Sequence, residues 1–120
     1  MRVLVVEPFK EPYEKEIDPG LDSLQHEVGG YIEAVYPFDD PVGIICNEEG
    51  KLDGLPLNRS LKGDDGEIYD VICGTFLIVG LGEEDFVSLS EEMTDKFREH
   101  FRVPEQFISV YGQIISLPVW

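Results

Sequence analysis

The sequence predicts an α+β fold, in which a mostly antiparallel sheet of about five strands carries two packed helices. Three observations predict it: short apolar runs rich in β-branched residues, an alternating segment followed by a proline turn, and one strong helical repeat of apolar residues. With 120 residues and a hydrophobic content of 42%, the chain can bury a core without disulfides or metals. We therefore expect a single domain over residues 1–120.

The amino-terminal part is expected to hold one buried strand and one short helix. The apolar run over residues 2–6 is typical of a buried strand, and the proline-containing segment over residues 8–17 is expected to be a loop. A short helix is predicted over residues 19–28, because Asp18 can cap it and a proline occupies its first position. The glycine pair at 29–30 should end it.

A β-hairpin is the strongest local prediction. Residues 31–36 alternate and are rich in strand formers, residues 37–41 supply a proline turn, and residues 42–46 form the second strand. Residues 47–50 then resemble a tight turn whose glycine takes a positive φ, and residues 51–52 are expected to begin another short strand.

The middle of the chain is predicted to contain the central strand. Residues 55–59 are expected to be irregular, and residues 62–66 form a polar loop. The most hydrophobic segment, residues 69–79, follows and predicts a central strand with a kink or bulge at Gly74.

A second helix is predicted over residues 88–103. Ser88 to Glu91 match a capping box, and Pro104 is expected to stop the helix. Apolar residues recur at a spacing of four along one face: Leu89, Met93, Phe97 and Phe101.

The carboxyl-terminal stretch, residues 106–120, is nearly uncharged. It predicts either a strand or a short helix packed on the sheet, or an apolar tail that contacts another subunit and makes a homo-oligomer. Both interpretations stay open from the sequence alone.

The chain is strongly acidic, with 9 Lys and Arg against 25 Asp and Glu and a formal net charge of -16. Both halves share the excess, because residues 1–62 carry 6 basic and 13 acidic groups and residues 63–120 carry 3 and 12. Such a surface repels nucleic acid and anionic membranes. It favours a basic or nucleic-acid-binding host protein as partner, although it can also serve solubility alone.

The sequence favours a cytoplasmic protein. The opening residues lack the features of a signal peptide, and no apolar stretch approaches the length of a membrane span. Cys46 and Cys73 both lie in apolar, strand-like runs, so we expect reduced buried thiols, with a disulfide between them as the alternative.

The sequence contains no pattern typical of a catalytic site. The only imidazoles, His26 and His100, lie on predicted helices, and no spacing typical of a zinc site is present. We therefore predict no catalytic residue, no metal site and no cofactor, and we expect the protein not to be an enzyme.

A candidate ligand-binding site is formed by two amides, two cations and one carboxylate: Asn47, Lys51, Asn58, Arg59 and Asp70. Under a functional interpretation they hold a small polar or nucleotide-like ligand between apolar anchors. Under a structural interpretation, which we prefer, the amides satisfy turn backbone and Arg59 pairs with a carboxylate such as Asp70.

Three segments carry a family resemblance: residues 45–52, residues 54–59 and residues 69–80. With the opening strand and the end of the first helix, they make residues 2–95 resemble the family called domain of unknown function 3846. The resemblance implies small proteins of plasmids, conjugative elements and phages, often encoded near antirestriction genes. It implies no catalytic residues.

Two functional hypotheses follow. In the first, the protein is a non-enzymatic accessory protein of a mobile element that binds or inhibits a host protein through its acidic surface, with an anti-defence role. In the second, it is a binding module for a small polar or nucleotide-like ligand.

Overall fold

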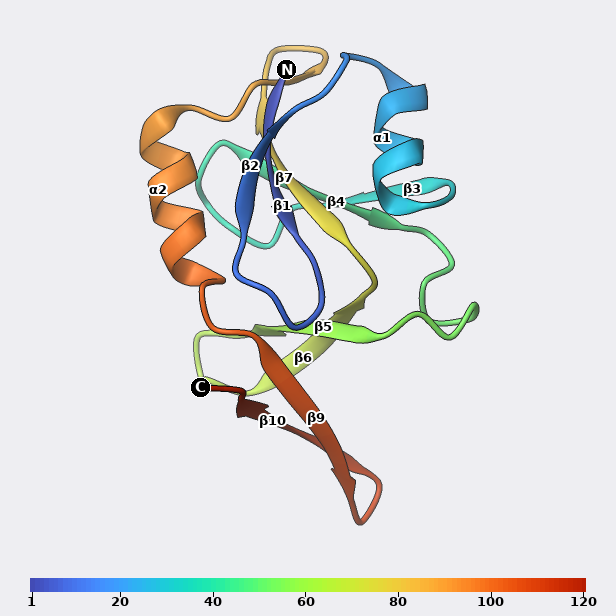
Figure 1. Cartoon of the computed structure of the whole chain (residues 1–120). Coiled ribbons are helices and arrows are strands. Elements are labelled where there is room, and N and C mark those ends of the chain that lie inside the picture. The colour runs from blue at the N-terminus through green and yellow to red at the C-terminus, as the bar shows by residue number, and fades with distance from the viewer.

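The computed structural model describes residues 1–120 and has an α+β fold built around one antiparallel sheet (Figure 1). The strand order of this sheet is β2-β1-β7-β4-β3, with β8 paired to the end of β7. Its strands are β1 (Arg2–Val6), β2 (Tyr13–Glu16), β3 (Ile32–Val35), β4 (Val42–Asn47), β7 (Phe76–Leu81) and β8 (Phe86–Val87).

Two helices and two separate strand pairs complete the fold. The helices are α1 (Leu21–Val28) and α2 (Glu91–His100), and the strand pairs are β5 (Leu57–Lys62) with β6 (Ile68–Cys73) and β9 (Glu105–Val110) with β10 (Gln113–Pro118). The predicted antiparallel sheet with two packed helices is therefore confirmed. The two extra strand pairs lie below the main sheet in Figure 1, and β9 contacts β5.

The helices cover opposite faces of the main sheet, as Figure 1 shows. Successive side chains of a strand point to opposite faces, so the apolar runs of β1, β4 and β7 supply both layers. On β1, Leu4 packs into the cluster under α2, whereas Val3 and Val5 pack into the cluster under α1. The central strands are consequently apolar at nearly every position.

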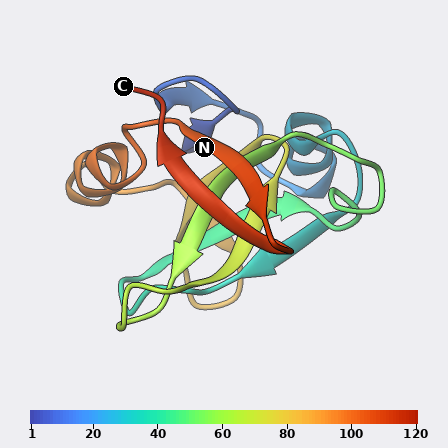
Figure 2. The same ribbon diagram turned by 90° about the horizontal axis from the view of Figure 1, so that it is seen from below.

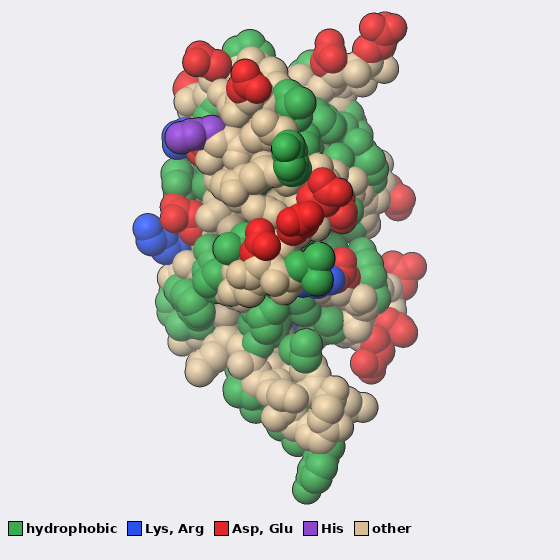
Figure 3. Space-filling view, turned by 90° about the vertical axis from the view of Figure 1, so that its right-hand side faces the viewer, with side chains coloured by type: hydrophobic (Ala, Val, Ile, Leu, Met, Phe, Trp, Pro, Cys, Tyr) green, Lys and Arg blue, Asp and Glu red, His purple; other side chains and the backbone are tan.

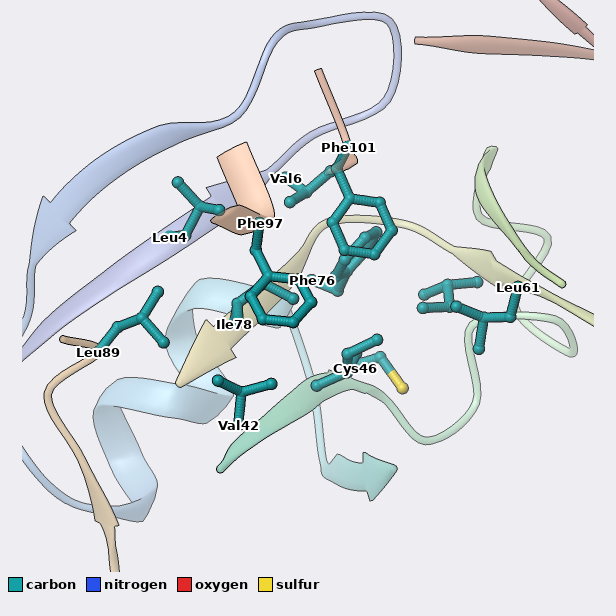
Figure 4. Close-up of a cluster of buried hydrophobic side chains, with 12 residues drawn as sticks. Leu4, Val6, Val42, Cys46, Leu61, Phe76, Ile78, Leu89, Phe97 and Phe101 are labelled. Carbon is teal, nitrogen blue, oxygen red and sulfur yellow. The ribbon is translucent and has the colours of Figure 1, made fainter. Parts of the chain in front are cut away.

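Aromatic rings fill the core layer under α2 (Figure 4). Phe97 and Phe101 are 1% and 3% exposed, and the ring of Phe101 meets that of Phe76 edge-on at a centroid distance of 5.3 Å. Leu89 lies in the same cluster and Met93 packs against it. The predicted apolar face of this helix is thus confirmed.

The amino-terminal predictions are correct for β1 but wrong in two details. Residues 8–17 are not all loop, because Tyr13 to Glu16 pair with β1 as an exposed edge strand. Helix α1 begins at Leu21 with Gly20 as its N-cap, so Asp18 does not cap it. Its predicted end is confirmed, since Gly29 has a φ of 79° and donates its N–H to the Gln25 carbonyl.

The hairpin of β3 and β4 is confirmed, but the predictions for the segment after it are partly wrong. Residues 51–52 lie in a turn rather than a strand. Gly50 has no positive φ; its role is close approach, because a Cβ there would lie 2.9 Å from the Cys73 carbonyl oxygen. Residues 55–59 are not wholly irregular, since β5 begins at Leu57 and pairs with β6.

The predicted central strand over residues 69–79 is two strands that belong to different sheets. Gly74, with a φ of 79°, ends β6 and turns the chain into β7. Strand β6 pairs with β5, whereas β7 lies between β1 and β4 at the centre of the main sheet. The kink at Gly74 was predicted. The sequence pattern did not predict that the chain changes from one sheet to another at this residue.

Helix α2 begins later than its capping pattern predicts. Ser90 is the N-cap and its hydroxyl accepts a hydrogen bond from the Met93 N–H, whereas the Ser88 hydroxyl accepts the N–H of Arg2. The helix ends at His100, before Pro104. The residues beyond it form the β9–β10 hairpin, which crosses in front of β5 and β6 when the molecule is seen from below (Figure 2).

Cys46 and Cys73 are buried free thiols, as expected, and no disulfide joins them. No helix of the protein has the length and apolar character needed to cross a membrane.

Replacing Ser90 with Ala should lower the free energy of unfolding by about 1 kcal/mol, because the first turn of α2 loses its side-chain acceptor. Chemical denaturation monitored by circular dichroism measures this change. Ser90→Asp keeps an acceptor and should retain most of the stability. Equal losses for the two variants would contradict the assignment of this N-cap.

Candidate functional site

The structure separates the five predicted site residues into two groups. Asn58 and Arg59 are completely buried, with exposures of 0%. Lys51 and Asp70 lie at the surface as an ion pair, and Asn47 is half-buried beside them. The two groups therefore lie in different environments, one in the core and one at the surface.

The Arg59 guanidinium is held by oxygen atoms from three parts of the chain. Nε and Nη2 donate to the carbonyl of Phe101 at 3.1 and 2.9 Å, and Nη2 also donates to the carbonyl of Lys10 at 2.7 Å. Nη1 donates to Oδ1 of Asn58 at 2.7 Å and to its carbonyl at 3.4 Å. These five bonds match the five N–H donors of a guanidinium, so no donor remains for a ligand.

No carboxylate pairs with this buried cation; the predicted ion pair of Arg59 with Asp70 is wrong, because Asp70 pairs with Lys51. Burial lowers the pKa of Arg59, and the more distant charge of Glu105 opposes that shift. The Phe101 carbonyl belongs to the C-cap of α2, where the helix dipole is negative. The helix end therefore supplies the negative potential that a carboxylate would otherwise provide.

Asn58 satisfies backbone groups, as the structural interpretation expected. Its Nδ2 donates to the carbonyls of Val6 and Gly74 at 2.9 and 2.8 Å. These carbonyls lie at the end of β1 and at the turn between β6 and β7. The amide thus joins the small β5–β6 pair to the main sheet, and with Arg59 it forms a structural junction.

The surface group lines a pocket of about 320 Å³ between β3, β4, β6 and the β4–β5 loop. Lys51 Nζ donates to Oδ1 of Asp70, and this bond raises the pKa of Lys51. Asn47 also lines the pocket, but its side chain is occupied: Nδ2 donates to the Val28 carbonyl and Oδ1 accepts the N–H of Glu49. Lys51 and Asp70 are therefore the predicted residues with polar atoms available to a ligand.

The floor of this pocket is apolar. Val35, Ile72, Cys46 and Cys73 line it together with the polar residues. Burial raises the pKa of the Cys46 thiol to about 11 and also raises that of Cys73. Both thiols therefore stay protonated near neutral pH and act as apolar surface rather than as nucleophiles.

Carboxylates surround the same pocket. Glu33 and Glu48 line it, and Glu49 and Asp53 lie on the adjoining β4–β5 loop. No salt bridge neutralises any of these four side chains, which we call the acidic patch: Glu33, Glu48, Glu49 and Asp53. No group of three or more His, Cys, Asp or Glu side chains is arranged to hold a metal ion.

The sequence interpretation did not single out the acidic patch. Adjacent carboxylates such as Glu48 and Glu49 are typical of solvated turns, and Glu33 lies in a different strand. Glu33 pairs with Cys46 across the β3–β4 hairpin, and this pairing brings Glu33 to the same pocket as Glu48. The alternating sequence pattern predicted this hairpin. The register of its two strands could therefore have shown that Glu33 lies beside Cys46.

Comparison with known proteins identifies one family. A family model described as domain of unknown function (DUF3846) matches residues 1–102. No curated protein and no solved structure matches the chain. The matched region includes the main sheet, both helices and the pocket, and it stops before the β9–β10 hairpin.

Replacing Arg59 with Lys should lower the free energy of unfolding by about 3 kcal/mol, because an ammonium cannot reach all the oxygens that the guanidinium holds and leaves buried acceptors unsatisfied. Urea denaturation of the variant measures the loss. Arg102→Lys is the matched control, since Arg102 is exposed and should change stability by less than about 0.5 kcal/mol. A stable Arg59→Lys protein would show that the junction is not structural.

Proposed function

We propose, from the premise that the chain belongs to the DUF3846 family of unknown function, that it is a non-enzymatic protein-binding module. In this proposal it acts in the cytoplasm as an accessory protein of a mobile element. Its partner is a basic or nucleic-acid-binding host protein, which it binds or inhibits through the acidic patch. An anti-defence role would follow from inhibition of a nucleic-acid-binding defence protein.

The observation that carries this proposal is the distribution of charge. Seven of the nine Lys and Arg side chains form ion pairs with carboxylates: Arg2, Lys10, Lys15, Lys51, Lys96, Arg98 and Arg102. Only eight of the 25 Asp and Glu side chains take part in salt bridges, which leaves 17 without a cation. None of the 25 is buried, so this excess negative charge faces solvent.

The acidic patch combines this charge with an apolar pocket. Figure 3 looks onto the side of the molecule that bears α1, β3 and the β4–β5 loop, and Asp and Glu side chains form a row across it. The pocket beside the patch has an apolar floor and carboxylates at its rim. An Arg or Lys side chain fits this chemistry, since its aliphatic stem can cover the floor while its cation meets the carboxylates.

The family setting supports the same class of partner. The resemblance implies proteins carried by plasmids and phages near antirestriction genes, and restriction enzymes must present basic surfaces to DNA. An acidic protein of this size can occupy such a surface in place of the DNA.

Neutralising the acidic patch should weaken binding to a basic host protein by at least about tenfold, because the carboxylates provide the attraction. The variant is Glu33→Gln/Glu48→Gln/Glu49→Gln/Asp53→Asn. The immobilised wild-type protein is used to capture partners from host lysate at about 50 mM salt, and affinity for a purified partner is then measured by interferometry.

The matched control carries the same change of net charge elsewhere: Glu83→Gln/Glu84→Gln/Asp85→Asn/Glu92→Gln. These side chains are exposed and form no salt bridge. Equal losses of affinity in the two variants would show that total charge acts without a specific patch. Binding that is indifferent to salt would contradict an electrostatic interface altogether.

A second candidate function is supported by the Lys51–Asp70 pair in the same pocket. Lys51 and Asp70 line a pocket of about 320 Å³ that lies near the lower end of the usual size of ligand sites. A small polar or nucleotide-like molecule would displace Asp70 from Lys51 and bind the ammonium. In this case Asn47 would contribute to the wall of the pocket. Asn58 and Arg59 would hold the strands that form it.

Replacing Lys51 with Met distinguishes the two candidates because it removes the only cation of the pocket. Under the first proposal the affinity for a basic partner should rise a few-fold, since Asp70 is released to the partner. Under the second proposal a small-molecule adduct seen by native mass spectrometry of the wild-type protein should disappear from the variant. The exposed pair should contribute little to stability, so the Lys51→Met variant should remain folded.

A further inference from the structure

The β9–β10 hairpin projects from the domain and presents an apolar outer face. The register pairs Ile108 with Ile115, Val110 with Gln113 and Gln106 with Leu117. Residues that pair across strands share a face. The other face turns toward β5, because Glu105 and Ser116 bond to each other there and Glu105 accepts hydrogen bonds from Ser60.

The side chains of the outer face are open to solvent. Its four aliphatic residues are between 38% and 44% exposed: Ile108, Val110, Ile115 and Leu117. Val119 and Trp120, which follow the hairpin at its base, are 43% and 60% exposed. A single copy of the chain therefore leaves a contiguous apolar surface uncovered, of the kind that marks an interaction site.

The tip of the hairpin carries a second unusual feature. Tyr111 and Gly112 have φ values of 51° and 78°, the combination found in a two-residue type I′ turn. The first position of such turns favours Asn, Asp or Gly, because a bulky side chain is strained at a positive φ. Tyr111 is nevertheless fully exposed, at 102%. The turn thus presents the ring of Tyr111 to solvent, where it is available to contact another molecule.

The hairpin is also the uncharged part of a highly charged molecule. No Asp, Glu, Lys, Arg or His occurs between residues 106 and 120, although the chain carries -16. Figure 3 shows the consequence, since the coloured charged groups cover the upper and middle parts of the molecule and are absent from the projecting lower end. A second copy of this chain carries the same net charge of -16 and can approach this uncharged end without meeting like charge.

We propose that the outer face of the hairpin is a homodimer interface, in which two hairpins stack face to face. The two copies are related by a two-fold axis perpendicular to their strands, so that each tip lies over the base of the other hairpin. Tyr111 of one copy then contacts Val119 and Trp120 of the partner. The central Ile108–Ile115 pairs face each other, and the two acidic bodies lie at opposite ends.

This arrangement agrees with the symmetry, the burial and the charge expected of a stable dimer. A two-fold contact is isologous, so one apolar face supplies both sides of the interface. Stacked sheets bury their facing side chains from water, which removes the exposed aliphatic surface. The distance between the bodies limits repulsion between two charges of -16. The interface uses none of the acidic patch and is independent of the proposed partner binding.

The test is sedimentation equilibrium of the full chain over a range of protein concentrations, at about 50 mM and about 500 mM salt. We expect a monomer–dimer equilibrium that shifts toward dimer at the higher salt concentration, because salt screens the repulsion between the acidic bodies. Ile108→Thr/Ile115→Thr keeps the β-propensity of both positions and should raise the dimer dissociation constant at least about 100-fold. Circular dichroism verifies that this variant is folded.

The matched control makes comparable changes at exposed apolar residues elsewhere, Leu52→Thr/Val87→Thr, and should leave the dissociation constant unchanged. Tyr111→Asn relieves the backbone strain, so it should raise the melting temperature of the monomer while it weakens the dimer. A chain that stays monomeric at all concentrations and salt levels would overturn the proposal. So would a dimer that the hairpin variant leaves intact, or one that salt dissociates.

Failure of the dimer and failure of partner binding give different results. Partner binding depends on the acidic patch and weakens with salt, whereas the dimer depends on Ile108 and Ile115 and strengthens with salt. A dimer that survives in the neutralised acidic-patch variant, together with loss of partner binding, is the result expected if both proposals hold.

Discussion

The buried guanidinium of Arg59 is the interaction on which the arrangement of the domain depends. It bonds to the loop between β1 and β2 through Lys10, to the end of α2 through Phe101, and to the neighbouring Asn58 on β5. A buried cation without a carboxylate is costly unless every donor is satisfied. Here the C-terminal carbonyl of a helix takes the place of the acid, so helix, loop and strand must keep one relative position.

This junction explains why Asn58 and Arg59, which the sequence suggested as ligand-binding residues, are not available at the surface. Asn58 and Arg59 bind backbone oxygens, and they thereby hold the β5–β6 pair against the main sheet. The same placement of β6 brings Asp70 to Lys51 and forms a wall of the pocket beside the acidic patch. The buried junction of Asn58 and Arg59 thus helps to position the pocket beside the exposed acidic patch.

The local elements were predictable wherever side-chain pattern and short-range chemistry agree. The apolar spacing of Leu89, Phe97 and Phe101 predicted α2, and the alternation before Pro37 predicted the β3–β4 hairpin. Edge strand β2 was missed because its sequence, Tyr-Glu-Lys-Glu, is exposed at every position and has no apolar face. The cap of α2 was misplaced because Ser88 and Ser90 are chemically alike, and only Ser90 faces the helix; the Ser88 hydroxyl is taken by Arg2.

The sequence by itself determined the α+β class, the two-sided apolar strands, the acidic charge and the family, because these follow from composition, periodicity and motif. Tertiary structure decided the partner of each polar group. Asp70 pairs with Lys51 rather than Arg59, and Gly74 passes the chain from one sheet to another. Glu33 joins the acidic patch through strand register, and the outer face of the β9–β10 hairpin is left without cover. Contacts between residues far apart in the chain decide such features, and local propensity does not encode them.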